Sequence, residues 1–179
     1  AIHAFEPLID CFTTLKKTHQ HDPHLVCHHI ALGDTSDTTT MERSSFHPSS
    51  SLLPMSGLHR TLYPKSADTC KEEVRIERLD GIAPTLALAE PLLVKIDVQG
   101  FEGEVIAGGK NTIRKAAVVI CEISFVPLYE GQALFDDIYQ ALRQLGFVYY
   151  GSVARHYSKR TNTLIYEDAV FIKPEFIRA

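Results

Sequence analysis

A chain of 179 residues is long enough for one globular domain with its own core and too short for two domains of ordinary size. Its net charge of −4 offers no basic surface for nucleic acid or an anionic membrane, and no apolar run reaches the length of a membrane-spanning helix. Its four cysteines are scattered without a C-x-x-C pair, which is typical of reduced cytoplasmic thiols. We therefore expect a cytoplasmic protein that binds neither nucleic acid nor a membrane.

The amino-terminal residues predict a short strand followed by an amphipathic helix. Residues 1–7 form a mostly apolar stretch that contains Glu6 near its end, and Pro7 suits the first turn of a helix, where a missing donor does no harm. Apolar residues then recur at helical spacing over 8–19. An acid at the end of the second strand of a nucleotide-binding sheet accepts hydrogen bonds from ribose hydroxyls, so Glu6 is a candidate for that role. The alternative is an acid favoured by the macrodipole at a helix start.

The stretch from 24 to 32 is rich in Val and Ile and predicts a further strand, followed by Gly33 and Asp34. Five nearby histidines lack a recognised metal-ligand spacing, so we interpret them as solvated surface residues and expect no metal site. Residues 34–73 are rich in Ser and Thr and contain three prolines. A segment of this kind is usually a lid, a binding loop or a disordered insertion, and composition alone does not separate a substrate-facing lid from a floppy insertion. Within it, 38–43 favours a short strand.

Residues 92–97 are the stretch around which the chain is organised. Their near-continuous apolar run predicts a strand buried on both faces, as in a parallel sheet. Asp97 closes the run, Gly100 permits a sharp turn, and a helical pattern opens at Glu102. A carboxylate at the carboxyl end of a central parallel strand lies where open α/β sheets bind ligands. The alternative is that Asp97 only caps the next helix.

The remaining elements predict alternating strands and helices with an antiparallel end. Residues 74–79 alternate with period two, Asp80 is placed to cap a short helix, and 116–123 reads as a buried strand with Glu122 near its end. An apolar helical stripe follows, stopped by Gly146, and two last strands at 147–150 and 164–172 suit an antiparallel hairpin. This order favours an α/β fold with a mostly parallel sheet.

Several motifs carry a resemblance to a known family. Lys95-Ile-Asp97-Val-Gln-Gly100-Phe-Glu102 resembles the K-I-D-V-E-G-x-E signature of the FkbM family of S-adenosylmethionine-dependent methyltransferases. Other segments resemble that family in the same order: Ala4-Phe-Glu-Pro7, Ala31-Leu-Gly33, Ser49-Ser-Ser-Leu52, Arg78-Leu-Asp80, Cys121-Glu-Ile-Ser124 and Pro127-Leu-Tyr129. The visible departure is Gln99, which stands where the family usually has a carboxylate.

The resemblance implies a Rossmann-like class I methyltransferase sheet and S-adenosylmethionine as cofactor. It also implies O-methylation of a hydroxyl on a small molecule, sugar or natural product. The candidate cofactor-binding residues are Glu6, Pro7, Ala31, Leu32, Asp34 and Asp97. Asp97 is also the candidate catalytic residue, and Gln99, Glu102 and Glu122 are candidate substrate contacts.

No glycine-rich turn follows a strand in this chain, whereas in the resembled family a first strand and its glycine loop precede the strand at 2–5. We therefore expect residues 1–179 to form a single, amino-terminally truncated domain with an irregular insertion or lid at 34–73. The strands at 2–5 and 92–97 would then pair directly, recruit another segment, or leave edges that favour a homo-oligomer. The missing loop and Gln99 also keep open an alternative function, a non-catalytic methyltransferase-like binding domain.

Overall fold

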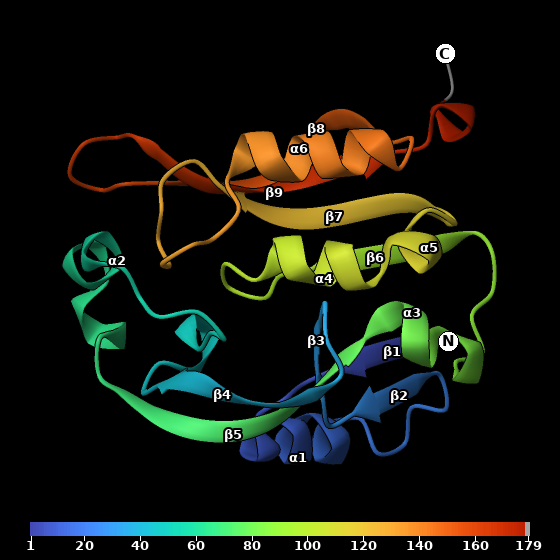
Figure 1. The fold of residues 1–179 in the computed structure, drawn as a ribbon, viewed down its shortest axis with the longest axis horizontal. Coiled ribbons are helices and arrows are strands. Elements are labelled where there is room, and N and C mark those ends of the chain that lie inside the picture. Colours follow the sequence, from blue (N-terminus) through green and yellow to red (C-terminus); the bar gives the residue numbers. More distant parts are fainter. Residues whose placement is uncertain (178–179) are drawn as a thin grey trace.

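The computed structural model describes residues 1–177, which form three separate sheets covered by helices (Figure 1). In chain order the strands and α-helices are β1 (Ile2–Phe5), α1 (Ile9–Thr18), β2 (Leu25–His28), β3 (Ala31–Gly33), β4 (Asp37–Ser44), α2 (Gly57–Leu62), β5 (Thr69–Arg78), α3 (Leu79–Ile82), β6 (Leu92–Ile96), α4 (Glu102–Gly108), α5 (Lys110–Ile113), β7 (Ala116–Ser124), α6 (Phe135–Gln144), β8 (Val148–Tyr157) and β9 (Leu164–Ile172). Short 3₁₀ helices lie at His47–Ser49, Pro64–Ser66, Ala83–Thr85 and Pro174–Phe176. None of the helices in this range is long and apolar enough to cross a membrane.

The sheets are mixed, so the fold is α/β as expected but the prediction of a mostly parallel sheet is wrong. The strand orders are β1-β2, β3-β5-β4 and β6-β7-β9-β8. The pairs β1–β2, β3–β5 and β6–β7 are parallel, whereas β4–β5, β7–β9 and β8–β9 are antiparallel. The antiparallel pairs arise where the strand expected at 38–43, β4, runs along most of β5 and where β9 pairs with both β7 and β8.

The single strand expected over 24–32 is also wrong, because the chain there divides between two sheets. His28 stacks on Phe5 of β1, whereas the next residue, His29, turns onto Phe12 of α1. The chain then leaves the first sheet, and β3 pairs with β5. α4 lies so close to β3 here that a Cβ at Gly108 would be 1.8 Å from the carbonyl oxygen of Gly33.

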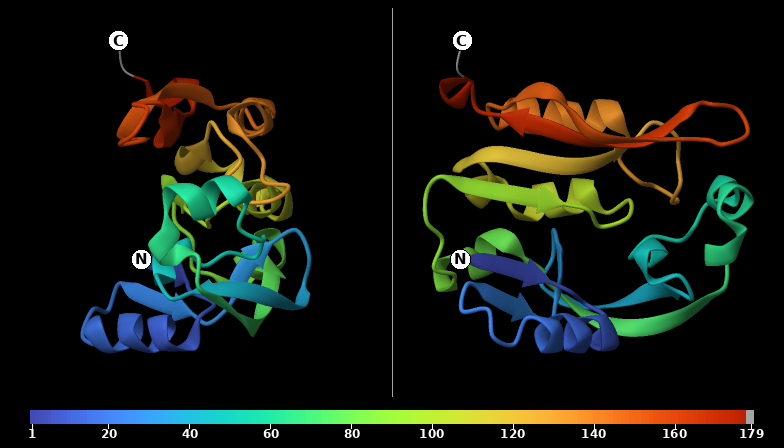
Figure 2. Two further views of the ribbon diagram at one scale, coloured as in Figure 1. Left: turned by 90° about the vertical axis from the view of Figure 1, so that its left-hand side faces the viewer. Right: turned by 180° about the vertical axis from the view of Figure 1, so that it is seen from behind.

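β6 lies at the edge of its sheet and is covered on one face only. Ile96 is 2% exposed, but Leu93 on the opposite face is 57% exposed, so the predicted burial on both faces is wrong. β6 pairs with β7, and β1 pairs with β2. Neither strand has a partner on its other edge among residues 1–177, and the two lie in different sheets (Figure 2). Association through these edges stays a prediction.

The main core lies between β7 and the helices that pack on its sheet. β7 is the most buried strand, and Val119 and Cys121 are fully inaccessible to solvent. The predicted stripe of α6 packs here through Ile138 and Leu142, and the chain leaves this helix at Gly146 with a positive φ of 90°. The expected antiparallel hairpin of β8 and β9 is confirmed.

Two further predictions concern local structure. Asp80 accepts hydrogen bonds from the backbone N–H groups of Asn111 (3.0 Å) and Thr112 (2.8 Å). It therefore caps the start of α5 across space, and the expectation that it caps the helix beginning beside it is wrong. The strand expected at 38–43 is confirmed as β4, so part of the segment 34–73 is regular structure. Its role as a lid stays a prediction.

Candidate functional site

A cavity of about 760 Å³ opens at the carboxyl ends of β1 and β6. Phe5 and Glu6 line it from β1 and the residue that follows, and Ile96 and Asp97 line it from β6 and the residue that follows. Its other walls come from the start of α1, from residues 46–63 and from Tyr166 on β9. The volume falls in the range of small-molecule sites. Segments far apart in the sequence therefore meet around one cavity.

Most of the residues singled out from the sequence line this cavity. These are Glu6, Pro7, Ala31, Leu32, Asp97, Gln99 and Glu122. Asp34 and Glu102 are not among the lining residues. Asp34 lies where β3 meets α4, and its Cα would be 3.1 Å from a Cβ at Gly108.

Glu6 sits between the first sheet and α1. Its Oε1 accepts a hydrogen bond of 2.8 Å from the backbone N–H of Leu8, so it does stabilise the helix start. Burial raises the pKa of the Glu6 carboxyl, although this backbone hydrogen bond opposes the change. The structural role and the expected ribose role are compatible, because a carboxylate accepts several hydrogen bonds.

A polar network links Asp97 to its neighbours. The Nζ of Lys95 lies 2.7 Å from Asp97 Oδ2, and the amide nitrogen of Gln99 donates to Asp97 Oδ1 (3.1 Å) and to Glu122 Oε1 (3.3 Å). Burial, together with the charges of Asp97 and Glu102, raises the pKa of Glu122 to about 8. The raised pKa favours the protonated form of Glu122 at neutral pH.

Gln99 is fixed from several sides in an unusual conformation. Its φ is 55°, a left-handed value uncommon for residues other than Gly and Asn. Its carbonyl oxygen accepts from Ser51 Oγ at 2.6 Å, and its side-chain oxygen accepts from the hydroxyl of Tyr129 at 3.1 Å. The same Tyr129 hydroxyl lies 3.2 Å from the carbonyl oxygen of Ser49. The Ser49–Ser51 segment and Tyr129 therefore hold the turn that follows β6.

Glu102 supports this turn from inside. Its side chain is 3% exposed, and its Oε1 accepts hydrogen bonds from the backbone N–H groups of Val98 (3.0 Å) and Gly100 (3.2 Å). Burial raises the pKa of Glu102 to about 7. Gly100 has a φ of 93°, and a Cβ there would lie 2.7 Å from the Tyr129 ring, so only glycine fits. A role of Glu102 in substrate binding stays a prediction, and its contacts are those of a structural residue.

Sequence reasoning missed the aromatic side of the cavity. His59 is 2% exposed and lines the cavity with Tyr63 and Tyr166. The hydroxyl of Ser66 donates to the carbonyl oxygen of Tyr63 (2.7 Å), so it must accept from His59 Nε2–H at 3.0 Å. His59 Nδ1 is then a lone-pair acceptor, and it has no hydrogen-bond partner among the described residues. The motifs at 49–52 and 127–129 were the sequence signals that pointed to this region.

The lining of the cavity combines two kinds of chemistry. Phe5, Leu8, Leu32 and Phe101 contribute apolar surface, and hydroxyl, imidazole and carboxyl groups contribute polar surface. Such a lining suits ligands that combine an apolar ring with hydroxyl groups.

Comparisons with known proteins agree with this picture. Residues 1–149 match a family model described as the methyltransferase FkbM domain. The 2-O-methyltransferase NoeI of Sinorhizobium fredii (strain NBRC 101917 / NGR234) is 44% identical over 59 residues, which are 33% of this chain and 24% of that protein. The alignment thus spans about a quarter of the relative's length. No solved structure matches the chain significantly. Because the family model covers most of the chain, the protein belongs to the FkbM methyltransferase family.

Proposed function

We propose that this domain transfers a methyl group from S-adenosylmethionine to a hydroxyl group of a small molecule. The observation that carries the proposal is that two acids at strand ends, Glu6 and Asp97, line one cavity in a chain of a methyltransferase family. That a partly aligned relative is named a 2-O-methyltransferase supports oxygen as the atom methylated.

The residues around Glu6 fit the adenosine part of this cofactor. The carboxyl of Glu6 would accept hydrogen bonds from ribose hydroxyls, and Leu32 and Phe101 offer an apolar wall for the adenine ring. Pro7 and Ala31 line the same cavity. The bound cofactor would supply an electrophilic methyl group on a sulfonium.

The protein's contribution to the reaction is mainly alignment, because a sulfonium is a good leaving group and the transfer is an in-line displacement. Asp97, which lines the cavity, would orient the acceptor and take the proton of its hydroxyl. Lys95 and Gln99 keep the carboxylate of Asp97 in place through both of its oxygens. The raised pKa of Glu122 favours its protonated form, which would offer a hydrogen-bond donor to a hydroxylated substrate.

The test uses the natural protein that contains this chain. S-adenosylmethionine with a labelled methyl group is incubated with the protein and a small-molecule extract of the source cells. We expect label in a hydroxyl-derived methyl ether and none in protein or nucleic acid, and we expect Asp97→Asn to lose the transfer while it keeps cofactor binding. Cofactor binding without any transfer would instead favour the non-catalytic binding domain, for which Gln99 in place of an acid is the supporting feature.

A further inference from the structure

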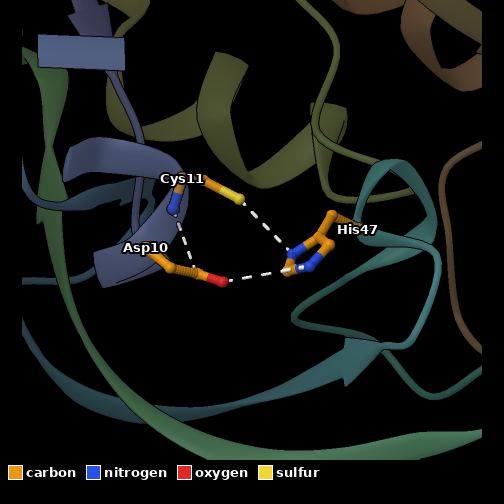
Figure 3. A group of neighbouring side chains, drawn as sticks. All are labelled: Asp10, Cys11 and His47. Atoms are coloured by element: carbon orange, nitrogen blue, oxygen red, sulfur yellow. Dashed lines mark hydrogen bonds and ion pairs between the residues drawn. The ribbon is translucent and has the colours of Figure 1, made fainter. Parts of the chain in front are cut away.

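A cluster of three different metal-ligating side chains lies at the rim of the cavity, on the side of α1. Asp10 and Cys11 are in the first turn of α1, and His47 begins a 3₁₀ helix. Figure 3 shows the three side chains pointing toward one another. Cys11 Sγ lies 3.4 Å from His47 Nδ1, and His47 Nε2 lies 3.9 Å from Asp10 Oδ2. One ligand atom from each residue lies within 4.8 Å of the other two.

We propose that Asp10, Cys11 and His47 form a binding site for Zn²⁺. The set of one thiolate, one imidazole and one carboxylate is the mixture that Zn²⁺ accepts, and it is too soft for Mg²⁺ or Ca²⁺. The five histidines between residues 19 and 29 contribute no ligand to it.

The spacing of sulfur and nitrogen fits such an ion. Zn–S bonds of about 2.3 Å and Zn–N bonds of about 2.0 Å at a tetrahedral angle place the two ligand atoms roughly 3.5 Å apart. The Cys11–His47 separation of 3.4 Å already matches this value. The Asp10 side chain is 47% exposed, so its carboxylate has room to turn the remaining distance toward the ion.

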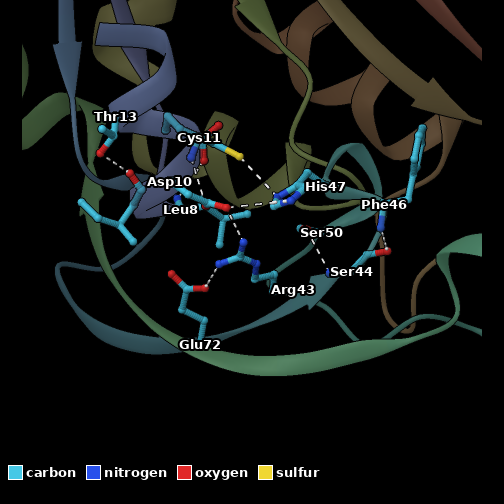
Figure 4. A network of polar contacts seen from close by, with 12 residues as sticks. Leu8, Asp10, Cys11, Thr13, Arg43, Ser44, Phe46, His47, Ser50 and Glu72 are labelled. Carbon is cyan, nitrogen blue, oxygen red and sulfur yellow. Dashed lines mark hydrogen bonds and ion pairs between the residues drawn. The ribbon is translucent and has the colours of Figure 1, made fainter. Parts of the chain in front are cut away.

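The charge around the cluster also favours a dication. Arg43 contacts the carboxylates of both Asp10 and Glu72, as Figure 4 shows, and its single positive charge is balanced by one of them. The carboxylate of Glu6 adds a further negative charge near the Cys11 thiol. With the metal-bound Cys11 thiolate, the carboxylates of Glu6, Asp10 and Glu72 make four negative charges against the one positive charge of Arg43, so the local electrostatics favour a dication.

The site would be open toward the cavity. Cys11 and His47 both line the cavity, and three protein ligands leave a fourth position for water or a ligand oxygen. Zn²⁺ binds the thiolate form of cysteine, so metal binding must release the proton of the Cys11 thiol.

The proposal is tested with metal alone on the purified, metal-free chain. Titration with Co²⁺ should produce the near-ultraviolet charge-transfer band of a cobalt thiolate, and Zn²⁺ should displace the cobalt and abolish the band. Cys11→Ser and His47→Gln should each weaken metal binding by more than the roughly 10- to 100-fold that the loss of an outer-shell partner costs. Cys70→Ser is the matched control, because Cys70 is an exposed free thiol on β5 outside the cluster.

The outcomes separate cleanly. A band in the original chain and in Cys70→Ser that disappears in Cys11→Ser supports the site. No band in the original chain, or a band that survives in Cys11→Ser, overturns it. The presence or absence of the cobalt–thiolate band in the original chain can be measured even where a variant fails to fold. None of these measurements depends on methyl transfer.

Discussion

Replacing Glu102 by Gln tests whether this buried carboxyl has a structural role beneath the turn after β6 and stays protonated in the folded state. The amide keeps an oxygen to accept from the N–H groups of Val98 and Gly100, but it has no charge to bury. The folded pKa is about 7, against 4.5 for an unperturbed Glu. Between these values the native state keeps a proton that the unfolded chain releases, so the stability of the original protein falls as pH rises from about 4.5 to 7.

The size of this effect follows from the difference in pKa. At 1.36 kcal/mol per pKa unit, the original protein loses up to about 3 kcal/mol across this range, and Glu102→Gln avoids that loss. We therefore expect the variant to be of similar stability at about pH 5 and more stable by up to about 3 kcal/mol at about pH 8. The charge of Glu102 also helps to raise the pKa of Glu122, so the comparison reports the two coupled carboxyl groups together.

The assay is urea unfolding of both proteins at a series of pH values, with the slope of the transition checked for two-state behaviour. Asp136→Asn is the control, since Asp136 is exposed on α6 and should leave the pH profile parallel to that of the original protein. A difference between the original protein and Glu102→Gln that stays constant from about pH 5 to about pH 8 would refute the reasoning.

Three further predictions concern the cavity. Glu6→Ala should weaken cofactor binding by up to about 1–3 kcal/mol if a buried ribose contact is lost, as calorimetry would show; unchanged affinity would remove its assigned role. Asp97→Asn should lower turnover far more than cofactor affinity, and equal turnover in both proteins would exclude Asp97 as the base. Gln99→Glu removes the donor to Asp97 Oδ1 and sets a second carboxylate beside it, so it should already destabilise the protein at neutral pH, and by about 1–3 kcal/mol more once the pH exceeds the Glu122 pKa of about 8. Unfolding curves on either side of that pH, with no extra loss above it, would contradict this.

The sequence predicted well those parts of the fold that depend on local pattern. The stripe of α6, the hairpin of β8 and β9, and the change from strand to helix between Asp97 and Glu102 are all visible in a few consecutive residues. The division into three sheets was not predictable in this way. Which strand pairs with which depends on distant contacts, such as the close approach of Gly108 to Gly33.

The same distinction applies to the site. Glu6 and Asp97 stand out in the sequence because acids at strand ends have a recognisable position. His59 lines the cavity from a segment without a recognisable pattern, and it packs there against Tyr129, which is held in turn by Ser49 and Gln99. The buried role of Glu102 was hidden because its partners are backbone groups, which no side-chain pattern reveals.

The most direct test of the central claim is a calorimetric titration of S-adenosylmethionine into the natural protein that contains this chain. Glu6→Ala is the site variant, and Asp136→Ala is a control that removes a carboxylate away from the cavity. The account predicts saturable binding to a single site, weakened in the first variant and unchanged in the second. Absence of binding, or equal binding by the original protein and Glu6→Ala, would contradict the assignment of this cavity to the cofactor.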